Sequence, residues 1–420
     1  MRRINALAVL TFLPLILDQF QGFIIIELGF SFPISVVIKM TLILYMINFI
    51  YSVNRMVLGL FLIFLFLPLF LSILVAFFRD YSYTFENFIF VTKVIYFPLV
   101  FLFFKNYFKV KQYDFSVVIN YLCYLYFIFF LFIALSIIGL GESLYGVNSE
   151  GVSIGYSGYF VAGNELGPIF IILSSVVLFF LLEKKKSLFL LLLLSVFNFV
   201  FAFLIGTKAA LLGSIAVTVV LPFYLYLKKA CRSNYSLKSY VVFVLSISLM
   251  SISIFSLLFH NVISAYVARW EFFYSQADSL ISFLLSGRLE RVEAAMFIFL
   301  EDYSFFEQLF GGGFVYFQTK MSPEYPRLIV EIDLLDSLLT FGIVGTVLVY
   351  SFWFYIAFSL FFRKVNNDTR FLIFVRFIFV VILSLSFISG HIIYSSLLGF
   401  YLALISSLSL AHNNRMGSCI

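Results

Sequence analysis

The chain has 420 residues, of which 63% are hydrophobic, 21% are aromatic and only 11% are charged. A soluble fold of this length needs more polar surface than these residues can supply, so the composition excludes a soluble protein and predicts one embedded in lipid. The formal net charge of +6 is expected to come from basic loops that set the membrane orientation, and we predict no nucleic-acid partner.

Apolar runs recur along the whole chain, and most are long enough to cross about 30 Å of hydrocarbon as a helix. We therefore predict an all-α polytopic integral membrane protein, with one membrane domain over residues 1–420 and about twelve spans. The first span is expected to be retained, because no small-residue cleavage site follows it. The predicted spans are 4–26, 32–53, 56–77, 87–104, 117–139, 162–182, 187–205, 206–227, 240–259, 334–361, 371–389 and 392–410.

Basic residues gather in every second loop. Placing the N-terminus inside puts two-thirds of the 27 Lys and Arg in cytoplasmic segments, which is the expected positive-inside bias. These residues are Arg2, Arg3, Arg55, Lys105, Lys109, Lys111, Lys184, Lys185, Lys186, Lys228, Lys229, Arg232, Lys238, Arg363, Lys364, Arg370, Arg376 and Arg415. We predict a bacterial cytoplasmic (inner) membrane protein with both termini in the cytoplasm and its active face in the periplasm.

Two loops on the predicted periplasmic side are long. The smaller loop, 140–161, is rich in Gly and Ser, and the larger loop, 260–333, joins spans nine and ten. Within the larger loop, Ser286 is suited to cap an amphipathic helix over 287–309 that lies along the membrane surface. The three glycines at 311–313 are suited to end that helix in a tight turn.

Four charged residues fall within the outer halves of the spans: Asp18, Lys39, Lys93 and Lys208. A charge at that depth is costly unless it is paired or hydrated, so these side chains should face one another or a water-filled cavity. Two interpretations are open for Lys39 and Lys93. Either they line such a cavity, or their role is structural, in which case they snorkel outward or pair with Asp18 or Glu27 to fix the packing of the helices. Because the charges lie on one side only, the group favours a cavity open outward over a transporter with midplane sites.

Two arginines of the larger loop suit a pyrophosphate held at headgroup depth. Arg288 and Arg291 are three residues apart and so share a helix face. Guanidinium groups bind phosphate oxygens bidentately. The alternative is that they pair with acids of the same loop, and the neighbours Glu290 and Glu293 favour this alternative for Arg291 over Arg288.

Candidate proton acceptors lie at the mouths of two spans. Glu331, Asp333 and Asp336 enter span ten, where the helix dipole keeps a carboxylate ionised and suited to act as a general base. Helix capping is the alternative, and it is stronger for Asp333 than for Glu331. His391, between spans eleven and twelve, suits either a base or phosphate ligand or an interfacial hydrogen-bonding residue. No P-loop and no metal-ligand motif is present in the sequence, so we predict neither a cofactor nor a metal.

Five short elements, in this order, resemble the O-antigen polymerase (Wzy) family, within the larger group that includes the O-antigen ligases. The resemblance covers the chain from about residue 160 to its end, and the earlier spans agree only in topology. The five elements are Phe160–Gly167 around Asn164, Gly206–Gly213 with its basic Lys208, Ser286–Arg288 with the glycines at 311–313, Glu331-x-Asp333 before Phe341–Gly345, and Ser389–His391.

This resemblance implies a glycosyltransferase that joins undecaprenyl-pyrophosphate-linked oligosaccharide repeat units into O-antigen or capsular polysaccharide at the periplasmic face. It implies that Lys208 and Arg288 bind the donor pyrophosphate and that Asn164 hydrogen-bonds glycan or phosphate, with Lys39 and Lys93 lining the cavity. A chain-length regulator in the same membrane is a candidate partner.

The ligases carry a His, their proposed base, at the position that Glu331 occupies here, and this difference favours a polymerase. It leaves the base open between Glu331, the first choice, and His391. The alternatives are an O-antigen ligase and a lipid-linked glycan flippase, but a flippase would need charges in the inner half of the membrane as well.

Overall fold

The computed structural model describes residues 2–30, 32–79, 84–111, 113–144, 155–184, 188–227, 264, 267–268, 271, 274–275, 288–321, 329–362, 369–388 and 390–417. These residues form an all-α multi-pass membrane protein, with ten helical segments long and apolar enough to cross a membrane. The predicted seventh span corresponds to α8 (Leu188–Ile205), a shorter apolar helix. The predicted ninth span, 240–259, lies outside the described residues, as do Ser286 and Gly287.

The ten spanning segments agree with the other ten predicted spans. Two of them contain a π-helical turn: η1 (Leu62–Phe66) joins α3 to α4, and η5 (Ala216–Val220) joins α9 to α10. The helices of these segments are α1 (Arg2–Leu28), α2 (Ile34–Val53), α3 (Arg55–Phe61), α4 (Leu67–Arg79), α5 (Thr84–Val110), α6 (Phe115–Leu135, extended by η3, Ser136–Ile138), α7 (Leu166–Glu183, preceded by η4, Gly163–Glu165), α9 (Lys208–Ile215), α10 (Leu221–Leu227), α17 (Asp333–Phe361), α18 (Arg370–Ile388) and α19 (Ser396–Gly417).

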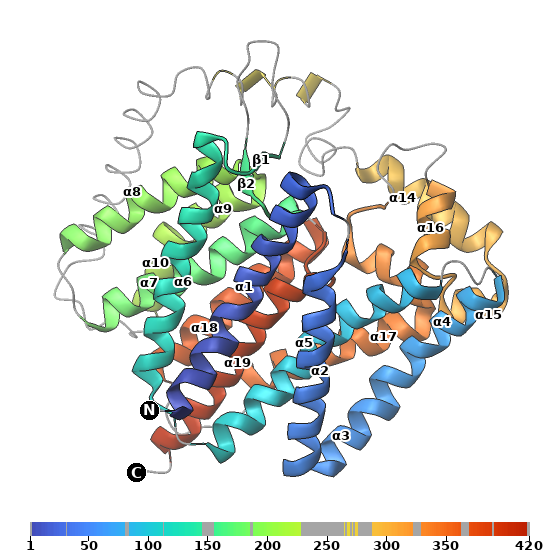
Figure 1. Cartoon of the computed structure of the whole chain (residues 1–420), viewed down its shortest axis with the longest axis horizontal. Coiled ribbons are helices and arrows are strands. Elements are labelled where there is room, and N and C mark those ends of the chain that lie inside the picture. Colours follow the sequence, from blue (N-terminus) through green and yellow to red (C-terminus); the bar gives the residue numbers. More distant parts are fainter. Residues whose placement is uncertain are drawn as a thin grey trace.

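Helices α5, α7 and α19 form the buried centre of the bundle, and α5 packs along α19 (Figure 1). Small residues on α19 allow this close approach. A Cβ at Gly399 would lie 3.0 Å from the Phe97 Cβ, and the Ser407 Oγ donates to the Phe101 carbonyl at 3.0 Å. Both chain termini lie at one end of the bundle, and the short hairpin of β1 (Glu142–Ser143) and β2 (Tyr156–Gly158) lies at the opposite end, here called the distal end (Figure 1).

The helix expected over 287–309 is interrupted. Helix α14 (Arg288–Phe297) continues into η6 (Ile298–Asp302), and the chain then turns extended at Tyr303. A new helix, α15 (Phe305–Phe310), begins because the side chains of Ser304 and Glu307 form a capping box that satisfies its first N–H groups. After the glycines comes α16 (Phe314–Met321). Apolar side chains of this segment, including Phe299 and Phe317, pack against Leu339 of α17, so the segment rests on that helix.

The three glycines at 311–313 do more than turn the chain. Helix α17 is broken at Gly342, whose φ is 67° and ψ −173°. The break frees carbonyl groups that lipid cannot satisfy. Gly312 N–H donates to the Leu339 carbonyl at 3.2 Å, and Gly313 N–H to the Thr340 carbonyl at 3.3 Å. The N–H groups of the glycine run therefore satisfy carbonyl groups that the break in α17 leaves without a partner in the helix. These bonds hold the start of α17 in place at the distal end.

Replacing Gly342 by alanine is expected to lower the free energy of unfolding by roughly 2–4 kcal/mol. The backbone conformation at Gly342 is one that only glycine adopts readily, and an added Cβ would lie 2.4 Å from the Leu309 carbonyl carbon. The thermal melting temperature in detergent measures the effect. Gly59→Ala is the matched control, because a Cβ at Gly59 meets nothing within 4 Å; equal melting temperatures for the two variants would contradict the prediction.

Candidate active site at the start of α17

Four predicted site residues, contributed by three separate segments of the chain, meet at the start of α17. Arg288 and Arg291 come from α14, Glu331 from the loop before α17, and His391 from the loop between α18 and α19. Glu331 Oε2 lies 3.1 Å from the Arg288 Nε and 3.0 Å from its Nη2. The Arg291 Nη1 is 3.6 Å from the same oxygen, and the His391 Nε2 is 3.9 Å from Oε1. The structure therefore gathers two guanidinium groups and an imidazole around one carboxylate.

The cluster is buried except on one side. The side chains of Arg288, Arg291 and Glu331 are 6–10% exposed, whereas that of His391 is 27% exposed. Arg291 also donates to the Ile329 carbonyl at 3.1 Å, so its described contacts are with the loop before α17. Glu290 and Glu293 were the partners expected for Arg291, and the fold brings Glu331 to it as well. His391 is the most exposed member of the cluster.

Glu331 and His391 both have strained backbones. Their φ angles are 63° and 61°, and no other non-glycine residue in the described part of the chain has a positive φ. Such a conformation costs roughly 1–3 kcal/mol and persists only where the surroundings enforce it. The two loops also touch, because a Cβ at Gly390 would lie 2.4 Å from the Glu331 carbonyl oxygen. Backbone strain is thus concentrated on the two residues that face each other.

Two buried carboxylates form hydrogen bonds with the backbone beside Glu331 and His391. Asp336 accepts hydrogen bonds from the N–H groups of Val330 and Glu331 at 3.0 and 3.1 Å. Asp333 accepts from those of Ile392 and Ile393 at 2.9 and 3.0 Å. Both residues are at most 1% exposed. The sequence offered Asp333 as a base or a helix cap, and the fold places it behind the His391 loop. The sequence grouped Asp336 with the other two acids as a candidate proton acceptor, and the fold places it behind Glu331.

The surrounding charges favour the protonated form of His391. Burial disfavours the imidazolium and alone would lower the pKa of His391, but the carboxylates of Glu331, Asp333 and Asp336 outweigh it. The pKa of His391 therefore lies above its ordinary value of 6.5. An imidazole in this range can exchange a proton near neutral pH.

A second polar cluster lies next to the same loop. The Lys39 Nζ contacts Asp18 at 2.6 Å and the Ser396 Oγ at 2.9 Å, and the Ser395 Oγ donates to Glu165 at 2.6 Å. The pairing of Lys39 with Asp18 is one of the two arrangements that the sequence left open. Glu27 instead accepts from the Tyr159 hydroxyl at 2.8 Å. The residues that follow His391 therefore tie the candidate site to α2 and to the start of α7.

The remaining predicted site residues lie around this second cluster. Lys93 is exposed, and its positive charge attracts the carboxylate of Glu165. Asn164 precedes Glu165 in the turn η4. Lys208 begins α9 behind the cap Thr207, and the start of α9 packs on α7, where a Cβ at Gly167 would lie 2.9 Å from the Ala210 nitrogen. Direct substrate contacts by these residues stay predictions.

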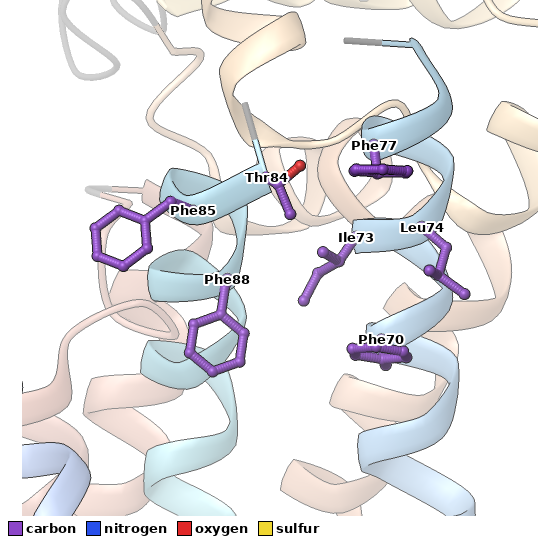
Figure 2. Close-up of a pocket in the computed structure, with 7 residues that line it drawn as sticks. All are labelled: Phe70, Ile73, Leu74, Phe77, Thr84, Phe85 and Phe88. Carbon is purple, nitrogen blue, oxygen red and sulfur yellow. The ribbon is translucent and has the colours of Figure 1, made fainter. Parts of the chain in front are cut away.

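An apolar groove of about 500 Å³ opens between α4 and α5, and none of its lining residues belongs to either polar cluster (Figure 2). Its lining includes four phenylalanines, and Thr84 is the one polar residue among the lining side chains in Figure 2. A sugar phosphate needs charged or hydrogen-bonding partners, which this lining does not supply. The polar cluster at the start of α17 is therefore the candidate active site.

Comparison with known proteins identifies the family of the chain. The model of a family described as O-antigen ligase like membrane protein matches residues 5–272 and 264–416, which span the membrane helices and every residue of the candidate site. No curated protein and no solved structure matches the chain. Members of the family are membrane enzymes that process lipid-linked glycans. Since the match covers nearly the whole sequence, the chain belongs to the O-antigen ligase-like membrane protein family.

Proposed function

We propose that this protein is a polysaccharide polymerase that transfers a growing glycan from undecaprenyl pyrophosphate to a lipid-linked repeat unit at the periplasmic face. The observation that carries the proposal is the cluster of Arg288, Arg291, Glu331 and His391. It combines cationic groups suited to a pyrophosphate with groups suited to accept a proton. Both are required when a hydroxyl attacks a sugar bound through pyrophosphate.

The arginines are proposed to bind the leaving group. In the described structure both guanidinium groups lie near one oxygen of Glu331. A donor pyrophosphate would replace this carboxylate oxygen as their partner, because it carries more negative charge and more acceptor oxygens than a carboxylate. As the bond between the anomeric carbon and the phosphate oxygen breaks, negative charge develops on the lipid pyrophosphate. Preorganised cations in a water-poor site stabilise that charge.

Glu331 and His391 are proposed to accept the proton together. The acceptor hydroxyl forms the new bond to the anomeric carbon and loses its proton. The greater exposure of the His391 side chain, 27% against 9% for Glu331, makes the imidazole the group that meets the hydroxyl. Glu331 faces the imidazole and stabilises the imidazolium that forms. This proposal modifies the sequence-based preference, which gave Glu331 as the first choice.

The choice of polymerase over ligase rests on Glu331, because the resemblance places the ligase histidine at this position. A flippase is less favoured, since the charged clusters described here sit at one end of the bundle. The test is deletion of the gene, followed by analysis of surface polysaccharide by gel electrophoresis. A polymerase deletion should leave single repeat units on the surface. Complete absence of attached repeat units would contradict the polymerase and favour a ligase or a flippase, and unchanged long chains would exclude all three.

A further inference from the structure

The start of α17 carries two fully buried aspartates. Asp336 accepts hydrogen bonds from Val330 and the strained Glu331, and Asp333 accepts from the two residues that follow the strained His391. We propose that Asp333 and Asp336 are positioning residues, one for His391 and one for Glu331, and that a single helical turn thereby sets the geometry of the acid–base pair. The inference rests on the proposed function. It gives a role to two residues that do not themselves contact the substrate in the proposed transfer reaction.

Asp336 acts on Glu331 through the backbone. Its two carboxylate oxygens accept from two successive N–H groups, those of Val330 and Glu331. A carboxylate that receives two neighbouring N–H groups fixes the peptide plane between them, and it offsets the cost of the positive φ at Glu331. An asparagine could accept only one of these bonds and would present an N–H₂ group to the other donor. The Glu331 backbone would then no longer be held in its strained conformation.

Asp333 acts in the same way on the opposite loop. One of its oxygens accepts from both Ile392 and Ile393, the two residues directly after His391. The next side chain, Tyr394, contacts the Ser337 Oγ through its hydroxyl at 2.7 Å, which also ties the loop to α17. These bonds fix the peptide that follows the strained His391 and so direct its imidazole toward Glu331.

Both aspartates belong to one turn of α17, three residues apart. The relative position of His391 and Glu331 therefore depends on a rigid element and not on two independent loops. This matters because proton transfer requires a close and aligned approach, and a displacement of about 1 Å at a reacting group can cost on the order of 100-fold in rate. The 3.9 Å between Nε2 and Oε1 is the distance that the two carboxylates maintain.

The experiment uses the purified full-length protein with a lipid-linked repeat unit. Asp333→Ala and Asp336→Asn should each lower kcat by about 10- to 100-fold, with KM for the donor changed less than about twofold, because Arg288 and Arg291 remain. Asp333 is replaced by alanine because the single amide oxygen of an asparagine could still accept both of its hydrogen bonds. Thr340→Val is the matched control. It replaces a buried hydroxyl one turn further along α17 that has no hydrogen-bond partner among the residues that the structure describes, so its kcat should stay within about twofold of wild type. Wild-type kcat in both aspartate variants would overturn the inference.

Double variants separate positioning from a general loss of structure. If Asp336 acts only through Glu331, Asp336→Asn should cause no further loss of rate in a Glu331→Gln background, and the same holds for Asp333→Ala in a His391→Asn background. Fully additive losses would show that the aspartates act otherwise, and the inference would fall. If Glu331→Gln and His391→Asn themselves keep wild-type rates, the proposed chemistry is wrong. If they are slow and the aspartate variants are fast, only the positioning role is wrong.

Discussion

Replacing Arg288 by alanine is expected to lower the rate of polymerisation by about 100-fold or more. Its guanidinium makes the two shortest contacts to Glu331, and in the proposed reaction it binds the pyrophosphate on which charge develops. The remaining Arg291 is 3.6 Å from the same oxygen and cannot supply the missing pair of donors. Arg288→Lys should recover only part of the rate, because an ammonium group cannot bind two oxygens in one plane. Initial rates with a purified lipid-linked substrate measure the effect.

Arg79→Ala is the matched control for that variant. Arg79 also pairs with a glutamate, Glu307, and its guanidinium lies 3.4 Å from the centre of the Tyr316 ring. The Arg79→Ala variant loses an arginine–glutamate pair that holds the same segment, and it leaves the residues of the proposed site unchanged. We expect the Arg79 variant to be less stable but to polymerise within a few-fold of wild type. Equal losses of rate in the two variants would mean that Arg288 contributes to folding rather than to the donor site.

Polymerisation is expected to become faster as the pH rises through the pKa of His391, which lies above 6.5. The imidazolium cannot accept a proton, so the protonated enzyme, which predominates at low pH, should be inactive, and the rate should level off once the imidazole is neutral. Burial opposes the upward shift, and the carboxylates of Glu331, Asp333 and Asp336 cause it. Rates measured from about pH 5.5 to about pH 9, a range that brackets the titration of a histidine, define the rising limb of the pH–rate profile when the ionic strength is held constant.

Two variants assign that limb to a residue. His391→Asn should lower the plateau by about 100-fold and abolish the limb, because the titrating group is gone. Glu331→Gln should move the limb to lower pH, since it removes one of the carboxylates that raise the pKa of His391. An unchanged limb in His391→Asn would show that another group accepts the proton. A limb that moves to higher pH in Glu331→Gln would contradict the electrostatic role given to that carboxylate.

Local patterns were enough to locate the membrane helices, because each span depends only on the length and hydropathy of its own segment. Ten predicted spans have a counterpart, and the seventh has the shorter helix α8. The expected surface helix was predicted less well. Its apolar periodicity continues past Asp302, but the capping box of Ser304 and Glu307 starts a new helix there. Here a specific side-chain interaction outweighed the periodicity.

The amino-acid sequence by itself determined that the protein is a multi-pass helical membrane protein, and it identified Arg288, Glu331 and His391 as candidate site residues. These conclusions follow from composition, charge placement and short motifs, all of which are local. Only the tertiary structure decided that these side chains share one site, that Lys39 pairs with Asp18, and that Asp333 and Asp336 hold the loops of His391 and Glu331. The physical reason is that contacts across 43 to 59 residues of chain, such as Arg288 to Glu331 and Asp333 to Ile392, depend on how the helices pack and leave no pattern in the local sequence.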